Sequence, residues 1–336
     1  MRDAICNNGT DWVWNEELSA IWGQNVSIDH LRISCGVFVS NSSESRSISP
    51  AENIGKDYTR YTLRGHTLRL FVSGKRDSLA PPGQSVTRVL YNLLMNASTT
   101  ARLIELNREF YTRFGDSFSA TRHRIQPGVR RVLGGLKGDE SILDLGCGNG
   151  ELARQLAKRG HRGSYLGVDF SLPLLRDAEA QPEGFSARFM EVDLTKLSAF
   201  GSQLSIKGGW SLITAFAVLH HIPSMELRLE ILRVVNELLT EDGLFIHSNW
   251  QFLNSEKLKA RIQPWEAVDL SDSQADVGDY LLDWRSGGTG LRYVHHFDER
   301  ELDELAAASH FQVIDTFYSD GETGNLGLYQ VWKPTY

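Results

Sequence analysis

The sequence predicts an α/β fold with a doubly wound, mostly parallel seven-stranded sheet, preceded by an N-terminal extension of undefined fold. Three observations indicate this class. Residues 141–150, SILDLGCGNG, are an apolar run that breaks into alternating glycines and opens a helix, which is typical of a parallel strand. From there on, strand patterns alternate regularly with helix patterns. A short glycine-containing turn joins the last two strand patterns, which predicts an antiparallel pair with one reversed edge strand.

Residues 1–95 lack this alternation, and we treat them as an extension of unknown function. They hold a Ser-rich stretch at 39–49 and a Pro-Pro-Gly break at 81–83. The β-rich residues 61–72, centred on Gly65, predict a hairpin. Three interpretations stay open: a small accessory domain, a partly disordered extension, or an artefact of an upstream start codon.

Residues 96–336 form the predicted α/β domain. Apolar residues at helical spacing predict one helix from residue 86 and a second over 104–114. The elements expected after these are strand 142–145, helix 151–159, strand 165–168, helix 172–180, strands 187–192 and 211–216, helix 225–239, strand 244–248, a polar insertion over about 250–295, helix 299–308, and strands 312–318 and 326–332.

The composition is that of a globular protein, with 41% hydrophobic and 23% charged residues. A formal net charge of −7 argues against a general nucleic-acid coat protein but leaves room for a local basic face. Cys6, Cys35 and Cys147 form neither a metal-binding spacing nor a disulfide framework, which favours a reducing compartment and no metal site. Residues 1–14 lack the apolar core of a signal peptide, and no apolar run is long enough for a bilayer, so we expect a cytoplasmic protein without membrane contact.

Acidic residues end three successive strand patterns, where a doubly wound sheet binds its ligand. Asp144 precedes the glycine turn, Asp169 ends the second strand and Asp193 ends the third. A carboxylate at Asp169 can accept both hydroxyls of a ribose, and one at Asp193 can meet the exocyclic amine of adenine. The alternative is that each carboxylate caps the following helix. Their occurrence at three strand ends after a glycine turn favours a nucleotide site.

The pattern resembles the class I S-adenosylmethionine-dependent methyltransferases over roughly residues 105–333. Their Asp-x-Gly-x-Gly-x-Gly turn matches 144–150, and their segment after the fourth strand matches the sequence AVLHHIP at 217–223. Nicotinamide dehydrogenases use Gly-x-Gly-x-x-Gly instead. The resemblance implies a Rossmann-like sheet with an antiparallel last strand and S-adenosyl-L-methionine as cofactor. The residues it implies for cofactor binding are Asp144, Gly146, Cys147, Gly148, Gly150, Asp169, Phe170, Asp193, Leu194 and Ala217.

Other segments resemble the methyltransferases that esterify the carboxylate of 5-carboxymethyluridine at the wobble position of tRNA. Residues 106–122 are similar to that family's first helix and its Phe-Ser-x-Thr-Arg motif, and 278–284 and 292–297 to its Val-Pro-Trp and Arg-Tyr-x-His-x-Phe segments. The resemblance implies tRNA modification with tRNA as a partner, and eukaryotic members work with a small zinc-binding activator subunit. The chain departs from the family in its N-terminal ninety or so residues, in lacking the oxygenase domain of some relatives, and in a less basic loop.

Methylation of a carboxylate needs no strong general base, because the nucleophile is already ionised at neutral pH. The enzyme must orient the carboxylate and remove its water, which cationic and hydrogen-bonding side chains can do. Each candidate for this task also has a structural alternative. Arg122 could form an ion pair on a helix surface, one of the histidines at 220 and 221 could hydrogen-bond at a helix end, and Trp250 could fill the edge of the sheet. Adjacent histidines at 295 and 296 point to opposite faces of a strand, so one is expected to face the pocket. The catalytic candidates are Arg122, His220, Trp250, Arg292 and His295.

The segment between residues 102 and 137 contains eight basic residues and only three acidic residues. This excess suits a phosphate-bearing substrate, unless acids elsewhere in the fold pair with it. The leading hypothesis is therefore a methyltransferase acting on a modified wobble uridine. Two alternatives stay open: a methyltransferase for a small acid or phenol, and a non-catalytic binding subunit with the same fold.

Overall fold

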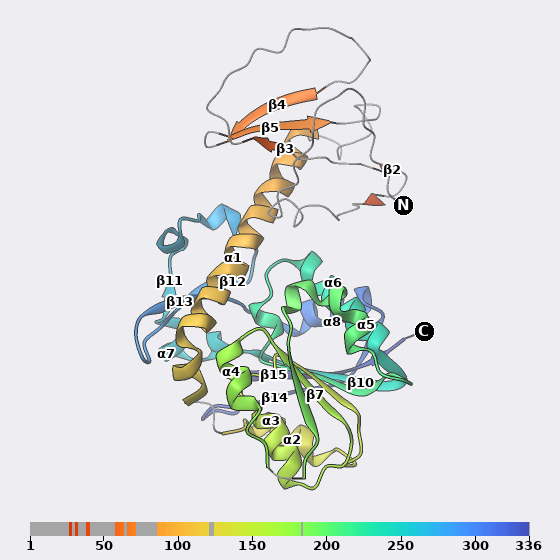
Figure 1. Cartoon of the computed structure of the whole chain (residues 1–336). Coiled ribbons are helices and arrows are strands. Elements are labelled where there is room, and N and C mark those ends of the chain that lie inside the picture. Colours follow the sequence, from red (N-terminus) through yellow and green to blue (C-terminus); the bar gives the residue numbers. More distant parts are fainter. Residues whose placement is uncertain are drawn as a thin grey trace. The chain divides into compact units, whose positions relative to one another are not determined.

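The computed structural model describes residues 86–120, 124–182 and 184–335, together with five short strands between residues 27 and 71 (Figure 1). Side chains are described from residue 97 on, except those of residues 118 and 120. The chain divides into two compact units, Met1–Tyr91 and Asn92–Tyr336.

The first unit contains two small sheets. β1 (Ser27–Ile28) pairs with β2 (Leu31–Arg32), and β3 (Phe38–Ser40), β5 (His66–Phe71) and β4 (Tyr58–Leu63) lie side by side in that order. The antiparallel pairing of β4 with β5 confirms the predicted hairpin.

A single long helix, α1 (Val86–Ala120), replaces the two helices predicted over this region. The polar stretch 96–100, which separates the two apolar patterns, contains neither proline nor glycine, so nothing in it ends a helix. In the second unit the buried face of α1 carries Leu103, Leu106, Phe110 and Phe114. No helix among the described residues is both long enough and apolar enough to cross a membrane.

The second unit is built on a seven-stranded sheet of order β14-β15-β10-β9-β6-β7-β8. The strands β6 to β10 pair in parallel, and β15 is antiparallel to both β10 and β14. The predicted reversed strand therefore exists, but it lies second from the edge because β15 inserts between β10 and β14. The strand bounds are β6 (Ile142–Leu145), β7 (Tyr165–Asp169), β8 (Ala187–Glu191), β9 (Trp210–Phe216), β10 (Leu239–Trp250), β14 (Phe311–Ser319) and β15 (Gly327–Pro334).

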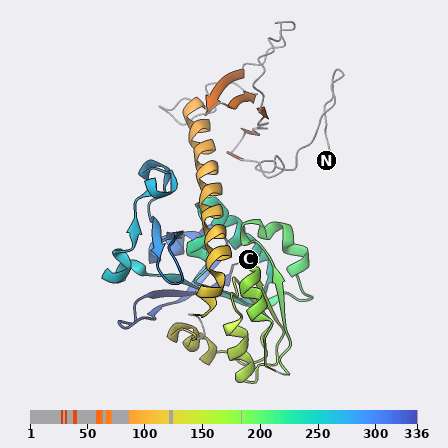
Figure 2. The same cartoon turned by 60° about the vertical axis from the view of Figure 1, so that its left-hand side comes forward.

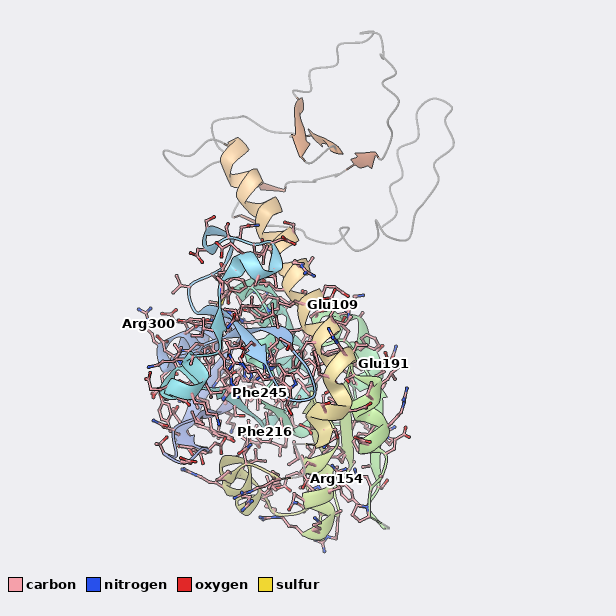
Figure 3. The ribbon with its side chains drawn as sticks, turned by 90° about the vertical axis from the view of Figure 1, so that its left-hand side faces the viewer. Glu109, Arg154, Glu191, Phe216, Phe245 and Arg300 are labelled. Atoms are coloured by element: carbon pink, nitrogen blue, oxygen red, sulfur yellow. The ribbon has the colours of Figure 1, made fainter. Side chains whose placement is uncertain are left out.

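Helices cover both faces of this sheet (Figure 1). One apolar core lies between the sheet and α5, α6 and α8, and the other between the sheet and α2 and α3. Phe245 is fully buried in the first core, whereas Glu109, Glu191 and Arg300 lie at the outside (Figure 3). The sequence analysis missed α2 and α5, which are only eight residues long. The helix bounds are α2 (Pro127–Gly134), α3 (Glu151–Lys158), α4 (Leu172–Ala178), α5 (Leu197–Leu204), α6 (Met225–Leu238), α7 (Glu256–Lys259) and α8 (Glu299–Ala308).

The polar insertion after β10 forms a small antiparallel sheet rather than a loop. It consists of β11 (Ile262–Gln263), β12 (Asp279–Trp284) and β13 (Gly290–His295). Its apolar residues, among them Leu281 and Tyr293, pack against Leu103 and Leu106 of α1. The insertion sheet and the second-unit part of α1 consequently lie side by side (Figures 1 and 2).

Candidate active site

A cavity of about 520 Å³ opens at the carboxyl ends of β6, β7, β9 and β10, in the size range of small-molecule and cofactor sites. Residues of α1 and Arg292 of β13 also line it. Gly150, His295 and His296 are absent from the lining, and Arg122 lies outside the described residues. The predicted site residues that line the cavity are Asp144, Gly146, Cys147, Gly148, Asp169, Phe170, Asp193, Leu194, Ala217, His220, Trp250 and Arg292.

The glycine turn after β6 adopts the left-handed backbone that its sequence predicts. Gly146, Gly148 and Gly150 have φ values of 68°, 55° and 76°. A Cβ atom on Gly146 would lie 2.5 Å from Val218, and one on Gly150 would lie 2.9 Å from Ala178. A Cβ on Gly148 would meet no atom within 4 Å, although the residue lines the cavity. Two glycines thus allow close packing, and the third leaves the turn's backbone open to a ligand.

Asp169 at the end of β7 fixes this turn against the next helix. Its carboxylate accepts the N–H of Gly148 at 3.0 Å and the N–H of Ser171 at 2.9 Å. Burial raises its pKa, and these hydrogen bonds oppose that rise. Each carboxylate oxygen has a second lone pair, so Asp169 can also accept hydroxyl groups from a ligand in the cavity.

Asp144 at the end of β6 is held by two hydroxyl groups. Tyr165 and Thr214 each donate a hydrogen bond of 2.7 Å to its carboxylate. Burial raises the pKa of Asp144 to about 6, against the opposing effect of these hydrogen bonds. Its neighbour Cys147 has a buried thiol that packs on β7 at Gly167, and burial raises the pKa of this thiol well above its ordinary value. The thiol is therefore protonated at neutral pH.

Asp193 caps a helix and also forms an ion pair. It is the N-cap of a short 3₁₀ turn, and one carboxylate oxygen accepts both the N–H and the hydroxyl of Thr195. The other oxygen lies 2.6 Å from a guanidinium nitrogen of Arg108 on α1. The capping alternative considered for this residue therefore applies, while its carboxylate still lines the cavity. Its contact with adenine stays a prediction.

Ala217 follows β9 in a strained conformation, with a φ of 59° that a residue with a Cβ atom rarely adopts. Its N–H donates to both the carbonyl and the hydroxyl of Ser248, each at 3.0 Å. Phe216, at the preceding position, also lines the cavity (Figure 3). Backbone strain of this kind is concentrated at functional sites, which agrees with the predicted place of Ala217 beside the cofactor.

Arg292 of β13 is a buried cation in the lining of the cavity. It is 4% exposed, and its guanidinium lies 4.9 Å from the ring centre of Trp250, 5.5 Å from Phe110 and 5.6 Å from Trp284. Its Nε has no hydrogen-bond partner, and none of the carboxylates in the described residues pairs with it. Burial lowers its pKa from the ordinary arginine value, and electrostatic interaction with Tyr111 counteracts this. The cavity therefore holds a guanidinium that has no counter-ion among the described residues.

Two histidines after β9 lie at the same wall. The Nδ1 of His220 accepts the N–H of Trp250 at 3.3 Å. The Nε2 of His221 lies 2.9 Å from the hydroxyl of Tyr111, and its Nδ1 lies 3.1 Å from the carbonyl oxygen of Tyr293. Both residues line the cavity, and both also hold neighbouring elements by hydrogen bonds, so the expectation that one of them is structural stays a prediction.

His295 belongs to a buried ionic cluster instead of the cavity. Its Nδ1 lies 2.6 Å from Asp279, its Nε2 lies 2.9 Å from Glu301, and Arg228 contacts both carboxylates. Burial acts to lower the pKa of His295, but the hydrogen bonds with the two carboxylates outweigh it and raise the pKa. The proposed acceptor role of His295 is corrected on this ground, and His296, which also lies outside the lining, does not replace it.

The family of the chain follows from its sequence. A family profile described as a methyltransferase domain matches residues 118–316, more than half of the chain. The chain is a class I S-adenosylmethionine-dependent methyltransferase. This methyltransferase has the cavity of its family at the carboxyl ends of the parallel strands, where the sequence predicts the donor site.

Three curated proteins are similar to parts of the methyltransferase. A Geobacillus sp. (strain WCH70) protein described as a methyltransferase is 35% identical over 124 residues, covering 35% of this chain and 46% of that protein. The 2-phytyl-1,4-naphtoquinone methyltransferase of Trichormus variabilis is 39% identical over 74 residues, covering 22% and 32%. The trans-aconitate 2-methyltransferase of Deinococcus radiodurans is 31% identical over 117 residues, covering 35% and 40%. The chain thus matches less than half the length of each relative.

The residues around the turn fit S-adenosylmethionine. The open face of Gly148 admits the backbone contact of the donor, and Asp169 has free lone pairs for the ribose hydroxyls. Leu194 and Phe170 supply apolar surface beside them for a purine ring. The cofactor supplies an electrophilic methyl group when bound. Residues of α1 and Arg292 of β13 line the same cavity.

The sequence analysis missed three polar residues of α1 that line the cavity: Asn107, Arg108 and Tyr111. All three fall in the segment 106–122, and they recur at the three- and four-residue spacing of one helix face. That spacing is the signal that could have identified them. Of the basic residues between 102 and 137, Arg108 pairs with Asp193 and Arg131 with Asp315, so acids elsewhere in the fold offset part of the predicted basic excess.

Proposed function

We propose that this methyltransferase esterifies a carboxylate attached to a planar ring, and that the acceptor is the carboxymethyl group of a modified wobble uridine in tRNA. The observation that carries the proposal is Arg292, a buried guanidinium in the cavity with no carboxylate partner in the described part of the chain. A buried cation needs an anion to offset its lost hydration, and a guanidinium fits a carboxylate through two parallel hydrogen bonds.

The rest of the wall suits the ring of such an acceptor. Aromatic side chains can stack on a base, and the cavity is lined by Tyr111, Phe170, Phe216, Trp250 and Tyr329. The segments 106–122 and 292–297, which resemble the wobble-uridine enzymes, contribute Tyr111 and Arg292 to it. The proposal therefore combines a charge requirement with a shape requirement.

In this mechanism the protein binds and orients, and it does not have to remove a proton. The acceptor carboxylate is ionised at neutral pH, so no residue is needed as a strong base. Arg292 binds the carboxylate, and the rings of Trp250 and Phe110 exclude water from it. Because the acceptor loses its negative charge as the ester forms, Arg292 stabilises the bound acceptor more than the transition state, and its effect is expected mainly on KM.

The acceptor is tested with labelled S-adenosylmethionine and three substrates. These are an anticodon stem–loop carrying 5-carboxymethyluridine, the same RNA with plain uridine, and trans-aconitate. We expect label in a base-hydrolysable ester of the modified RNA only. Label in trans-aconitate without label in RNA would replace tRNA by a small acid, and donor binding without transfer to any of the three substrates would contradict both proposed carboxylate acceptors.

A small acid is the second candidate, because a relative with 31% identity is named for trans-aconitate. Salt separates the two. Binding of tRNA involves many phosphates and weakens steeply as the salt concentration rises, whereas a small acid held by Arg292 responds weakly. A KM that stays nearly constant between 50 and 200 mM salt (roughly the range over which phosphate contacts lose affinity) would favour the small acid.

Arg292 is tested directly by Arg292→Ala and Arg292→Lys. Loss of a buried charge partner costs about 2–5 kcal/mol, so Arg292→Ala should raise KM for the acceptor by roughly 30-fold or more. Arg292→Lys keeps the charge but loses the fork geometry, and we expect an intermediate KM. Donor affinity, measured by calorimetry, should stay unchanged in both. Arg300→Ala, on the exposed side of α8, is the matched control, and an unaltered acceptor KM in Arg292→Ala would refute the role.

A further inference from the structure

The C-terminal end of α1 is connected to the glycine turn by a buried serine. Ser119 is 2% exposed, and its hydroxyl donates a hydrogen bond of 2.5 Å to the carboxylate of Asp177 on α4. The side-chain amide of Asn149 donates to the same hydroxyl oxygen at 3.1 Å and to the Ser119 carbonyl at 3.5 Å. Asn149 lies between Gly148 and Gly150 and lines the cavity. One residue of α1 thus joins the turn to α4.

The chemistry of these groups explains why a hydroxyl is needed at this place. An ionised carboxylate only accepts, so the single hydrogen of the Ser119 hydroxyl is used by Asp177. The hydroxyl oxygen keeps its lone pairs and accepts the amide of Asn149, a side chain that is itself buried. The Ser119 carbonyl lies in the last turn of α1, where backbone oxygens lack a partner within the helix, and the same amide supplies one. Without the hydroxyl, the Asn149 amide would keep only the longer of these two bonds.

Close packing of α1 on α4 holds the serine in place. One helical turn before Ser119, a Cβ atom on Gly115 would lie only 3.3 Å from Pro173, so the two helices approach closely there. Gly115 and Pro173 each lie four residues before a member of the Ser119–Asp177 hydrogen bond, which shows that the helices run side by side in the same direction (Figures 1 and 2). Aromatic residues of α1 also pack with Leu174 of α4. The position of the hydroxyl is therefore set by the packing of both helices.

The glycine turn is held at two consecutive residues. Asp169 accepts the N–H of Gly148 and also that of Ser171, the N-cap of α4. Ser119 accepts the side chain of Asn149, the next residue of the turn. The backbone that faces the cavity thus has a fixed conformation before any ligand binds, and less conformational entropy is lost when the donor binds.

We propose that Ser119 is a positioning residue for S-adenosylmethionine: its hydroxyl, through Asn149, holds the glycine turn in the conformation that receives the donor. Ser119 does not line the cavity, so it acts on the donor only through its neighbour. The inference concerns the donor site and does not depend on which acceptor is methylated. It gives a role to the end of the segment 106–122, which the proposed function leaves unassigned.

Donor binding is the first test and needs no acceptor. Loss of a hydrogen bond between uncharged groups typically changes affinity by roughly three- to tenfold, so Ser119→Ala should raise the dissociation constant of S-adenosylmethionine by that factor in a calorimetric titration. Ser198→Ala is the matched control, because it removes a similar bond, 2.7 Å from a serine hydroxyl to the Glu230 carboxylate, outside the cavity lining. Unchanged donor affinity in folded Ser119→Ala would overturn the proposal.

Hydrogen exchange separates a local effect on the turn from a general loss of stability. In Ser119→Ala without donor, the amide hydrogens of Gly148 and Gly150 should exchange faster than in wild type, while those of β6 keep their rate. Equal acceleration in the turn and in β6 would make Ser119 a merely structural residue. Asp177→Ala, at an exposed position, removes the carboxylate that orients the hydroxyl and should accelerate the same turn amides. It decides the matter if Ser119→Ala does not fold, and unchanged turn amides in it would then refute the role.

A double-mutant cycle tests whether Asn149 transmits the effect. Asn149→Ala removes the partner of the hydroxyl in the turn, so in this background Ser119→Ala should change the donor dissociation constant by less than about twofold. Equal effects of Ser119→Ala in the two backgrounds would mean that the serine acts by another route, and the proposal would be wrong.

Discussion

At the scale of single residues, Asp169 links the glycine turn, the next helix and the predicted ribose site. Its carboxylate accepts two backbone N–H groups, one from the glycine turn and one from the start of α4. The two bonds hold the carboxylate in one rotamer before any ligand binds, so little conformational entropy is lost on binding. The residue is therefore a preorganised acceptor, and its removal should affect the donor more than the fold.

Asp169→Ala is expected to weaken binding of S-adenosylmethionine by at least roughly tenfold, since hydrogen bonds to a carboxylate contribute about 1.5–3 kcal/mol. Calorimetric titration with the donor measures the change, and circular dichroism checks that the fold is kept. Asp315→Ala is a matched control, because Asp315 is exposed and pairs only with Arg131 among the described contacts. An unchanged dissociation constant in folded Asp169→Ala would remove Asp169 from the donor site.

The sequence was sufficient to place Asp169, Gly148 and Arg292 in the lining of the cavity, but it placed His295 there wrongly. Alternation along β13 explains the error. Tyr293 and His295 share one face of the strand and meet Asp279 on β12, while Arg292 points to the other face and into the cavity. The period of two was available in the sequence, but the acidic partners of His295 come from distant segments that no local pattern identifies.

At the scale of elements, the strand–turn–helix unit of β6 and α3 depends on backbone conformations that only glycine adopts easily. Its three glycines have different surroundings: Gly146 lies against Val218, Gly150 lies against Ala178, and Gly148 lines the cavity. Gly160, after α3, has a similar φ of 70° but no atom near the position of a Cβ. This set allows strain, packing and ligand contact to be measured separately.

Alanine at these positions should divide the three effects. Gly160→Ala should lower the free energy of unfolding by about 1–2 kcal/mol through left-handed strain alone. Gly146→Ala should cost roughly 1–3 kcal/mol more, because its methyl group would overlap Val218. Gly148→Ala should resemble Gly160→Ala in stability but weaken donor binding. Urea unfolding and donor titration measure both quantities, and normal donor affinity in Gly148→Ala would contradict its place against the cofactor.

Elements with a clear period were predicted within a few residues, whereas the continuity of α1 and the strands of the insertion were not predicted. The predicted break within α1 was a change in composition without a helix-ending residue, so the helix continues through it. The insertion was predicted only as a polar segment without assigned elements, yet β12 and β13 form because their apolar residues are covered by α1. Such tertiary burial decides the structure of a short segment, and the segment's own sequence does not contain it.

At the scale of the whole molecule, acid stability depends on a histidine that does not itself line the cavity. His247 on β10 is fully buried, stacks on Phe245 and contacts Trp332 edge-on. Burial lowers its pKa from 6.5 to about 3. The folded state therefore binds no proton here at a pH where the unfolded chain does, so its contribution to stability is complete above pH 6.5 and is lost as the pH falls towards 3.

The free energy of unfolding should consequently fall by up to roughly 5 kcal/mol from this residue between pH 6.5 and 3. The prediction is tested by the slope of stability against pH in His247→Gln, which should be shallower than that of wild type in this window. The slope is the measurement because the substitution also removes packing. His310→Gln, with an exposed side chain, should keep the wild-type slope, and an unaltered slope in His247→Gln would refute the assignment.

The position of β15 bears on how this protein is made. Of the seven strands, β15 is the last in the sequence, yet it separates β14 from β10 in the sheet. On the ribosome, the five parallel strands can pair as they emerge, but β14 has no neighbour and β10 keeps an open edge until Gly327–Pro334 has been translated. The sheet is thus completed by its final strand, and interrupted synthesis before that point leaves two unpaired strand edges available for aggregation.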